Sequence, residues 1–109
     1  MNVKDLMFAI EKYSKEKTIN RINVSSIASL HGVILDFKEF FEDEMVISVF
    51  TKERKFMAIL YIPLDAEISL VYKGDAYDIF LLIDDRFFVF DDIPKEIVDK
   101  LKEENKEER

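Results

Sequence analysis

A chain of 109 residues fits one domain, and with 49% apolar residues it can bury a core without disulfides or metals. It has no cysteine, which excludes a disulfide framework, a thiolate zinc site and a cysteine nucleophile. The net charge is −7 and uneven: residues 1–35 hold five Lys and Arg against three Asp and Glu, and residues 36–109 hold eleven against twenty. Most of the surface therefore repels a phosphate backbone.

The sequence indicates a protein that works in the cytoplasm. The longest apolar run, residues 56–62, is too short to span a bilayer, and the first residues carry an acid and no apolar stretch of the kind a signal peptide needs. Gln is absent, while Lys and Glu number 12 each. This bias is typical of a thermophile, and an AT-rich genome produces a similar bias.

The chain opens with a helical pattern. Apolar residues recur at steps of three and four, with charged residues between them, at Val3, Leu6, Met7, Ile10 and Tyr13. The polar stretch 14–18 ends this helix. A short second helix is expected over residues 24–30, with Asn23 or Ser25 as its cap and Gly32 as the left-handed residue that closes it.

The stretch FKEFFEDE, residues 37–44, belongs to a segment whose period favours a third helix over residues 33–43. Its apolar residues lie three and four apart, at Val33, Ile34, Phe37, Phe40 and Phe41. Leu35 lies off this seam. The acids after Phe41 are unfavourable at a helix C-terminus, so either the helix ends early or these acids serve something other than stability.

From Met45 onward the pattern changes to strands. Apolar runs separated by short polar connections predict an antiparallel β-meander of four to five strands, over residues 45–50, 56–62, 68–72, 77–83 and 87–90. A last helix is expected near Pro94. We therefore predict an α+β fold with N-terminal helices, a meander and a C-terminal helix, as a single domain over residues 1–101 with a polar, frayed tail over 102–109.

Several predicted strands are apolar on both faces, whereas a sheet with one wet face alternates apolar and polar residues. Either the helices cover both faces, or one face needs another cover. A second subunit, a barrel-like curl or a ligand cavity would supply it. Self-association is the interpretation we favour over the cavity.

Three helices followed by a hairpin is the order of a winged helix, and residues 1–62 resemble that family. The spacing of Ala28 and Gly32 is similar to that of a helix-turn-helix. The resemblance implies a DNA-reading helix over residues 33–43, yet that helix would carry four acids and one base. For this alternative the basic contacts would be Lys12, Lys15, Lys17 and Arg21.

The stretch Phe37-Lys38-Glu39-Phe40-Phe41 also resembles the core of a sliding-clamp-binding peptide. The glutamine of such peptides is replaced here by Ile34, and the segment is not in a tail. We expect these phenylalanines to contribute to the core. The candidate residues for contact with a partner are Phe40, Phe41, Glu42, Asp43 and Glu44.

The sequence offers no catalytic constellation. Asp84-Asp85 and Asp91-Asp92 flank a strand and lie roughly 20 Å apart, too far to share a metal ion, so we expect turns and a helix cap. His31 is the only histidine, and the two glycines do not form a phosphate loop. We therefore expect no enzyme, no metal and no cofactor.

The favoured function is a small acidic, non-catalytic interaction or regulatory module that contacts a protein partner and acts as a homodimer. Nucleic acid and membrane are not expected partners. The alternatives are a winged-helix transcription regulator, and a binder or enzyme with an apolar cavity in the sheet.

Overall fold

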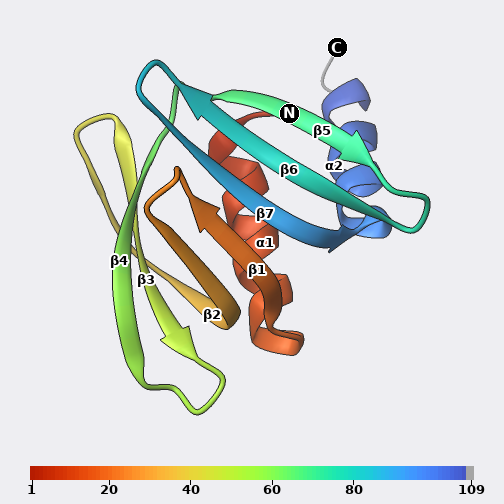
Figure 1. Ribbon diagram of the computed structural model, residues 1–109. Coiled ribbons are helices and arrows are strands. Elements are labelled where there is room, and N and C mark those ends of the chain that lie inside the picture. The colour runs from red at the N-terminus through yellow and green to blue at the C-terminus, as the bar shows by residue number, and fades with distance from the viewer. Residues whose placement is uncertain (108–109) are drawn as a thin grey trace.

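The computed structural model describes the backbone of residues 1–107 and shows an α+β fold: an N-terminal helix, a seven-stranded antiparallel sheet and a C-terminal helix (Figure 1). The strand order is β4-β3-β2-β1-β7-β6-β5. The sheet has more strands than the four to five that we expected. The elements are α1 (Val3–Glu16), β1 (Ile19–Val24), β2 (Ala28–Phe41), β3 (Glu44–Thr51), β4 (Phe56–Pro63), β5 (Glu67–Tyr72), β6 (Ala76–Ile83), β7 (Arg86–Pro94) and α2 (Lys95–Glu107).

Helix α1 lies where its apolar period predicts it. The Asn2 side chain caps it by accepting a hydrogen bond of 2.8 Å from the backbone N–H of Asp5. The predicted seam faces the sheet, with buried side chains at Val3, Leu6, Met7 and Ile10. Helix α2 begins directly after Pro94, as expected. It continues to Glu107, so the predicted tail overlaps its second half, and residues 108–109 lie outside the described ones.

The second predicted helix, over residues 24–30, is wrong. This segment is the tip of the hairpin that joins β1 to β2, where Ser25 has a φ of 49° and Ile27 is exposed. Gly32 does adopt the predicted left-handed conformation, with a φ of 59°, but it lies within β2 and not at a helix end. Asp92 likewise lies within β7, with a φ of 57°, and does not cap α2.

The third predicted helix, over residues 33–43, is also wrong, because this segment is the second half of β2. A β-bulge adds Lys38 between the pairs Phe37–Ile47 and Glu39–Val46. The bulge shifts the alternation, so that Phe37 and Phe40 lie on one face and Phe41 on the other. Leu35, which was off the helical seam, is fully buried as part of the strand. With two of its three helices replaced by strands, the winged-helix resemblance fails.

Helix α1 takes the place of β1 beside the second half of β2. Strand β1 pairs with β2 only as far as Ile19 opposite Val33. Beyond that point the backbone N–H of Leu35 donates to the Ser14 hydroxyl of α1 at 2.9 Å. The N–H of Phe37 donates to the Glu11 carboxylate at 2.5 Å. These bonds satisfy donors that β1 leaves unpaired, and they fix α1 against the sheet.

The sheet must curl, because its two outermost strands are consecutive in the chain. Six strand spacings would separate β4 from β5 by roughly 29 Å in a flat sheet. The connection Leu64–Ala66 can span only roughly 14 Å. The edges therefore converge at this end, and Figure 1 shows the sheet bent around α1.

Both helices cover the same face of the sheet, which we call the inner face (Figure 1). The core lies between them and the inner side chains of the strands, where Leu35, Ile47, Ile79 and Phe90 are 0–1% exposed. The interpretation in which the helices cover both faces is therefore wrong. The opposite side, the outer face, has no helix over it within residues 1–107.

Candidate interaction surface

The outer face carries buried apolar side chains although no helix covers it. Ile34, Val46 and Val89 are 4–7% exposed, yet they lie outside the cluster that packs against α1 and α2. Alternation places them on the outer face, where they are shielded by neighbouring side chains on the same strands. This face therefore has an apolar layer of its own, one side chain thick.

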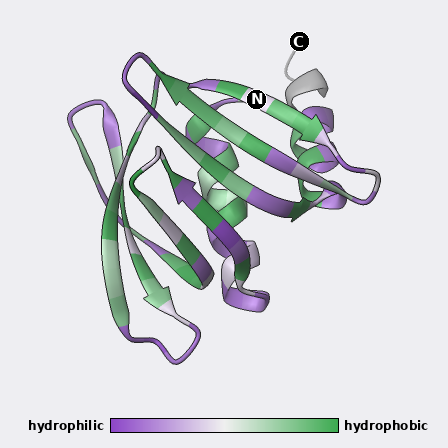
Figure 2. Ribbon diagram, in the orientation of Figure 1, coloured by the Kyte–Doolittle hydropathy of each residue, from purple (hydrophilic) through white to green (hydrophobic). Residues whose placement is uncertain are grey.

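Strand β4 exposes the largest part of this layer. It forms one edge of the sheet, and its eight residues, FMAILYIP, include no charge. The side chains that point away from the core are Phe56, Met57, Ile59 and Tyr61, and they are 60%, 40%, 37% and 46% exposed. Figure 2 shows β4 as an apolar strand that begins at a hydrophilic connection. Edge strands are normally protected from pairing with another chain by charges, prolines or bulges. Strand β4 has no charge, its proline is its last residue, Pro63, and a bulge adds Met57 near its start.

Neighbouring strands extend the apolar surface. The ring of Phe56 meets that of Phe50 on β3 edge to face, with centroids 6.0 Å apart. Phe41, at the end of β2, is 56% exposed. It lies opposite Glu44, and the alternation of side chains along β3 places this pair on the outer face. We define the β4 surface as the apolar outer side chains of β2, β3 and β4 that are not fully buried: Phe41, Phe50, Phe56, Met57, Ile59 and Tyr61. The acids Asp36, Glu39 and Glu44 lie beside it on the outer side of β2 and β3.

The structure separates the residues that the sequence singled out for partner contact. Phe41 belongs to the β4 surface. Phe40 is 47% exposed at the rim of the inner face, where its ring centroid lies 4.9 Å from that of Phe37 and 6.3 Å from that of Phe8. Of the three phenylalanines expected in the core, only Phe37 packs against it, so the expectation is wrong for Phe40 and Phe41. Glu42 and Asp43 form the turn between β2 and β3, and Glu44 pairs with Arg86 at 3.2 Å.

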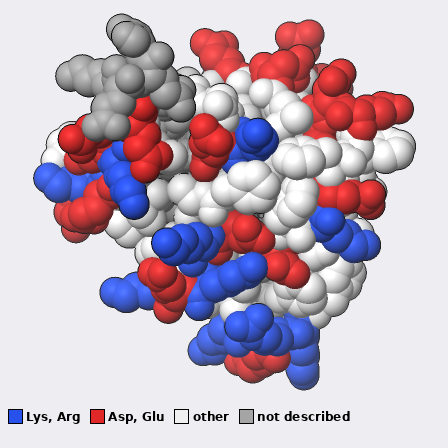
Figure 3. Space-filling view, turned by 180° about the vertical axis from the view of Figure 1, so that it is seen from behind, with Lys and Arg blue, Asp and Glu red and all other residues white. Residues whose placement is uncertain are grey.

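The two ends of β4 have opposite charge. The connection before β4, residues 52–55, has three bases and one acid, Lys52, Glu53, Arg54 and Lys55. At the other end, the backbone N–H of Leu64 donates to the carbonyl of Asp43 at 2.8 Å, so the acidic turn lies beside the end of β4 and next to Asp65. Figure 3, seen from behind, shows bases gathered at the lower end and acids at the upper right.

A polar cluster crosses the outer face between β1 and β6. Arg21 donates to the buried carboxylate of Asp91 at 2.5 Å, and Asn20 donates to Asp92 at 2.8 Å. Lys73 pairs with Asp92 at 2.6 Å and with Asp78 at 3.4 Å. The hydrogen bond from Lys73 lowers the pKa of the Asp92 carboxyl, and the same bond raises the pKa of the Lys73 amine. The cluster is internally paired and separates the β4 surface from the β5 edge.

The four basic residues considered for nucleic acid do not form one surface. Arg21 is bound to Asp91 on the outer face, whereas Lys12 and Lys15 are on α1. Lys15 bonds to Asp36 at 2.8 Å and to Glu11 at 3.3 Å, and the bond to Asp36 raises the pKa of its amine. Lys17 follows the end of α1. Two of the four charges are therefore already matched by acids.

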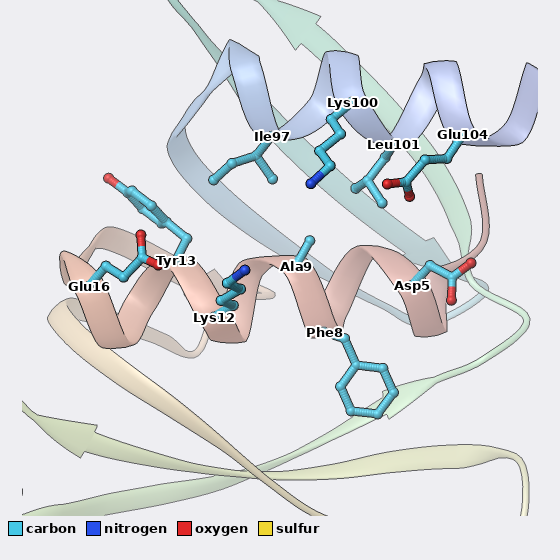
Figure 4. Close-up of a pocket in the computed structure, with 10 residues that line it drawn as sticks. All are labelled: Asp5, Phe8, Ala9, Lys12, Tyr13, Glu16, Ile97, Lys100, Leu101 and Glu104. Atoms are coloured by element: carbon cyan, nitrogen blue, oxygen red, sulfur yellow. The ribbon is translucent and has the colours of Figure 1, made fainter.

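A groove of about 460 Å³ lies between α1 and α2, outside the sheet (Figure 4). The amines of Lys12 and Lys100 point into the space between the helices, while the ring of Phe8 points away from it. Three acids also line it, Asp5, Glu16 and Glu104. The charges nearly cancel, so the groove does not select an ion of either sign.

Within residues 1–104, whose side chains the structure describes, no group of three or more His, Asp or Glu side chains is placed to hold a metal ion. Tyr61 lies on one edge strand, and Tyr72 stacks on Tyr77 at the other edge with ring centroids 5.1 Å apart, so these tyrosines do not converge on a cavity. In the described part of the chain neither helix has the length and apolar content to cross a membrane. Comparisons with protein-family models, curated proteins and solved structures found no match.

Proposed function

We propose that the protein is a small non-catalytic interaction module that acts as a homodimer, with the β4 surface as the contact. The observation that carries the proposal is the combination on one strand of a free sheet edge, no charge, and four exposed apolar side chains. Exposed apolar surface of this kind costs free energy in water, at roughly 25 cal/mol per Å². Contact with a second protein surface removes that cost.

A second copy is the partner that the charges favour. The chain has a net charge of −7, so two copies repel each other at most orientations. The side chains of the β4 surface are apolar, and they lie between the basic connection 52–55 and the acidic end at Asp43 and Asp65. Two copies can therefore meet there with each basic end against an acidic one.

Light scattering tests the proposal. At high micromolar concentration we expect a mass of twice 12.9 kDa. The double substitution Phe56→Ser/Tyr61→Ser should raise the dissociation constant more than tenfold, because burying each side chain contributes about 1.5–3 kcal/mol. The matched control Val71→Ser/Leu82→Ser removes exposed apolar side chains of β5 and β6 and should leave the mass unchanged. A 12.9 kDa monomer at that concentration would refute the proposal.

The proposal also predicts no appreciable binding of duplex DNA at physiological salt. The net charge is −7, and Lys15 and Arg21 are already paired with acids. A gel-shift titration with a 20–30 base-pair duplex should show no complex at micromolar protein. Nanomolar binding with a steep salt dependence would contradict this part of the proposal.

A further inference from the structure

We infer that the two copies pair through β4 itself, antiparallel about a two-fold axis, so that their sheets join into one continuous sheet. This inference rests on the proposed homodimer and specifies its geometry. The β4 strand has one neighbour, β3, so the backbone N–H and C=O groups along its other side lack a strand partner among the described residues. A second antiparallel β4 would satisfy these groups.

The charge pattern favours the antiparallel direction. Strand β4 starts at the basic connection 52–55 and ends beside Asp43 and Asp65. An antiparallel copy places the start of each strand beside the end of the other. Both basic connections then lie next to acidic ends, and the contact is made twice because the interface is symmetric. A parallel arrangement would place like charges together at both ends.

The exposed side chains favour one register. In the joined sheet, the outer faces of both copies lie on the same side. Outer residues of one β4 strand must therefore lie opposite outer residues of the other. The outer residues Met57, Ile59 and Tyr61 are symmetric in sequence about Ile59, and Met57 is the extra residue of a bulge that follows Phe56. A register centred on Ile59 places Ile59 opposite its own copy and Met57 opposite Tyr61 of the second copy. A register centred on Leu60 would instead place Met57 opposite Pro63.

Cysteine cross-linking tests the register, because the chain has no cysteine of its own. Directly opposed residues have Cβ atoms roughly 5 Å apart, within reach of a disulfide. Under mild oxidation, Ile59→Cys should form a linked dimer in more than half of the chains. Met57→Cys and Tyr61→Cys should each stay unlinked alone and should link when mixed. The control Val71→Cys, at a position on the β5 edge that is 46% exposed and so at least as accessible as Ile59, should stay unlinked.

Charge reversal tests the direction of pairing. Lys52→Glu/Lys55→Glu makes both ends of β4 acidic, and Asp43→Lys/Asp65→Lys makes both basic. Each variant alone should dimerise at least tenfold more weakly than the native chain, and a mixture of the two should recover a heterodimer of near-native affinity. All four positions are exposed, so folding should be retained, which circular dichroism checks.

The outcomes separate the inference from the proposed function. A native dimer in which Ile59→Cys does not link, or Val71→Cys links equally well, overturns the β4 pairing and leaves the homodimer standing. Variants with reversed charge that do not recover on mixing overturn the antiparallel direction. A native chain that is monomeric at high micromolar concentration overturns both the inference and the proposed function.

Discussion

The two edges of the sheet occupy equivalent positions but differ in chemistry. Strand β4 has eight residues and no charge, and its outer residues Met57, Ile59 and Tyr61 are all apolar. Strand β5 has six residues and begins at Glu67, and its outer residues alternate acid, hydroxyl and apolar at Glu67, Ser69 and Val71. Beyond the β5 strand, Lys73 is held by Asp78 and Asp92.

For the proposed homodimer, this difference favours β4 over β5 as the edge that pairs with a second chain. A short edge with a charge at its outer side resists the addition of a strand, and β5 has this form. A chain with one sheet edge that can pair forms a closed dimer. A chain with two such edges would form an open-ended oligomer.

The strongest test of the comparison separates the two sides of β4. Leu60→Ala removes a side chain that is 6% exposed in the core, and should lower the free energy of unfolding by about 2–5 kcal/mol. Ile59→Ala, one residue away on the outer side, should change the stability of the monomer by less than about 1 kcal/mol while weakening the dimer. Urea denaturation at low micromolar protein measures the first effect and light scattering the second. Equal losses of monomer stability would contradict the assignment of the two sides.

A second test removes the protection of β5. Glu67→Ile/Ser69→Ile gives β5 an outer side like that of β4, so we expect assemblies larger than a dimer, seen as faster species in sedimentation velocity. The control Glu67→Gln/Ser69→Thr removes the charge without adding a large apolar side chain, and should remain a dimer. If the first variant also remains a dimer, the outer side chains do not decide which edge associates.

A third test concerns salt. Contacts between basic and acidic ends are screened as ionic strength rises, so the dissociation constant of the dimer should increase several-fold between low salt and about 0.5 M salt. Analytical ultracentrifugation measures this change. Lys52→Gln/Lys55→Gln should bind more weakly at low salt and depend less on salt. An affinity that rises with salt would indicate that the ends repel each other.

The smallest expected effect concerns the ion pair on the β5 side. Because the pKa of Asp92 is lowered in the folded chain, its contribution to stability is present above the pKa of the unfolded chain, roughly 3.9, and is lost as the pH falls through the lower folded value. The melting temperature of Asp92→Asn should therefore lie slightly below that of the native chain near pH 7 and converge with it in strong acid. The dimer should not change with this substitution. A difference that grows toward low pH would contradict the sign.

The predictable part of the fold was the part with a clear helical period or with apolar runs between polar connections. Helix α1 has the first pattern and strands β3 to β7 the second, and the structure confirms them to within a few residues. Strand β2 was missed because the bulge at Lys38 changes its alternation into a spacing of three, which imitates a helix. Strand β1 was missed because half of its residues are polar, with the sequence INRINV. Two of them, Asn20 and Arg21, belong to the polar cluster on the outer face.

The candidate surface could be predicted only in part. The sequence singled out Phe41, Glu42 and Asp43, which lie at the edge and at one end of the β4 surface. It also showed that residues 56–62 are apolar on both faces. Which strand forms an edge depends on strand order, and that order follows from the pairing of β1 with β7, a contact between distant segments. The absence of charge over residues 56–63 marks an apolar strand, but on its own it is typical of a central strand. The local signal for an edge was Pro63 at the end of the run.

The pairing of β1 with β7 also sets the order in which the chain can fold. Arg21 and Asp91 are 70 residues apart, so their contact closes a long loop, whereas β2, β3 and β4 are joined by tight turns. We therefore expect the β2–β4 hairpins to form early in refolding and the β1–β7 ladder to form late. Until that ladder closes, β1 is itself a temporary edge, with its β7-facing backbone groups open to other chains.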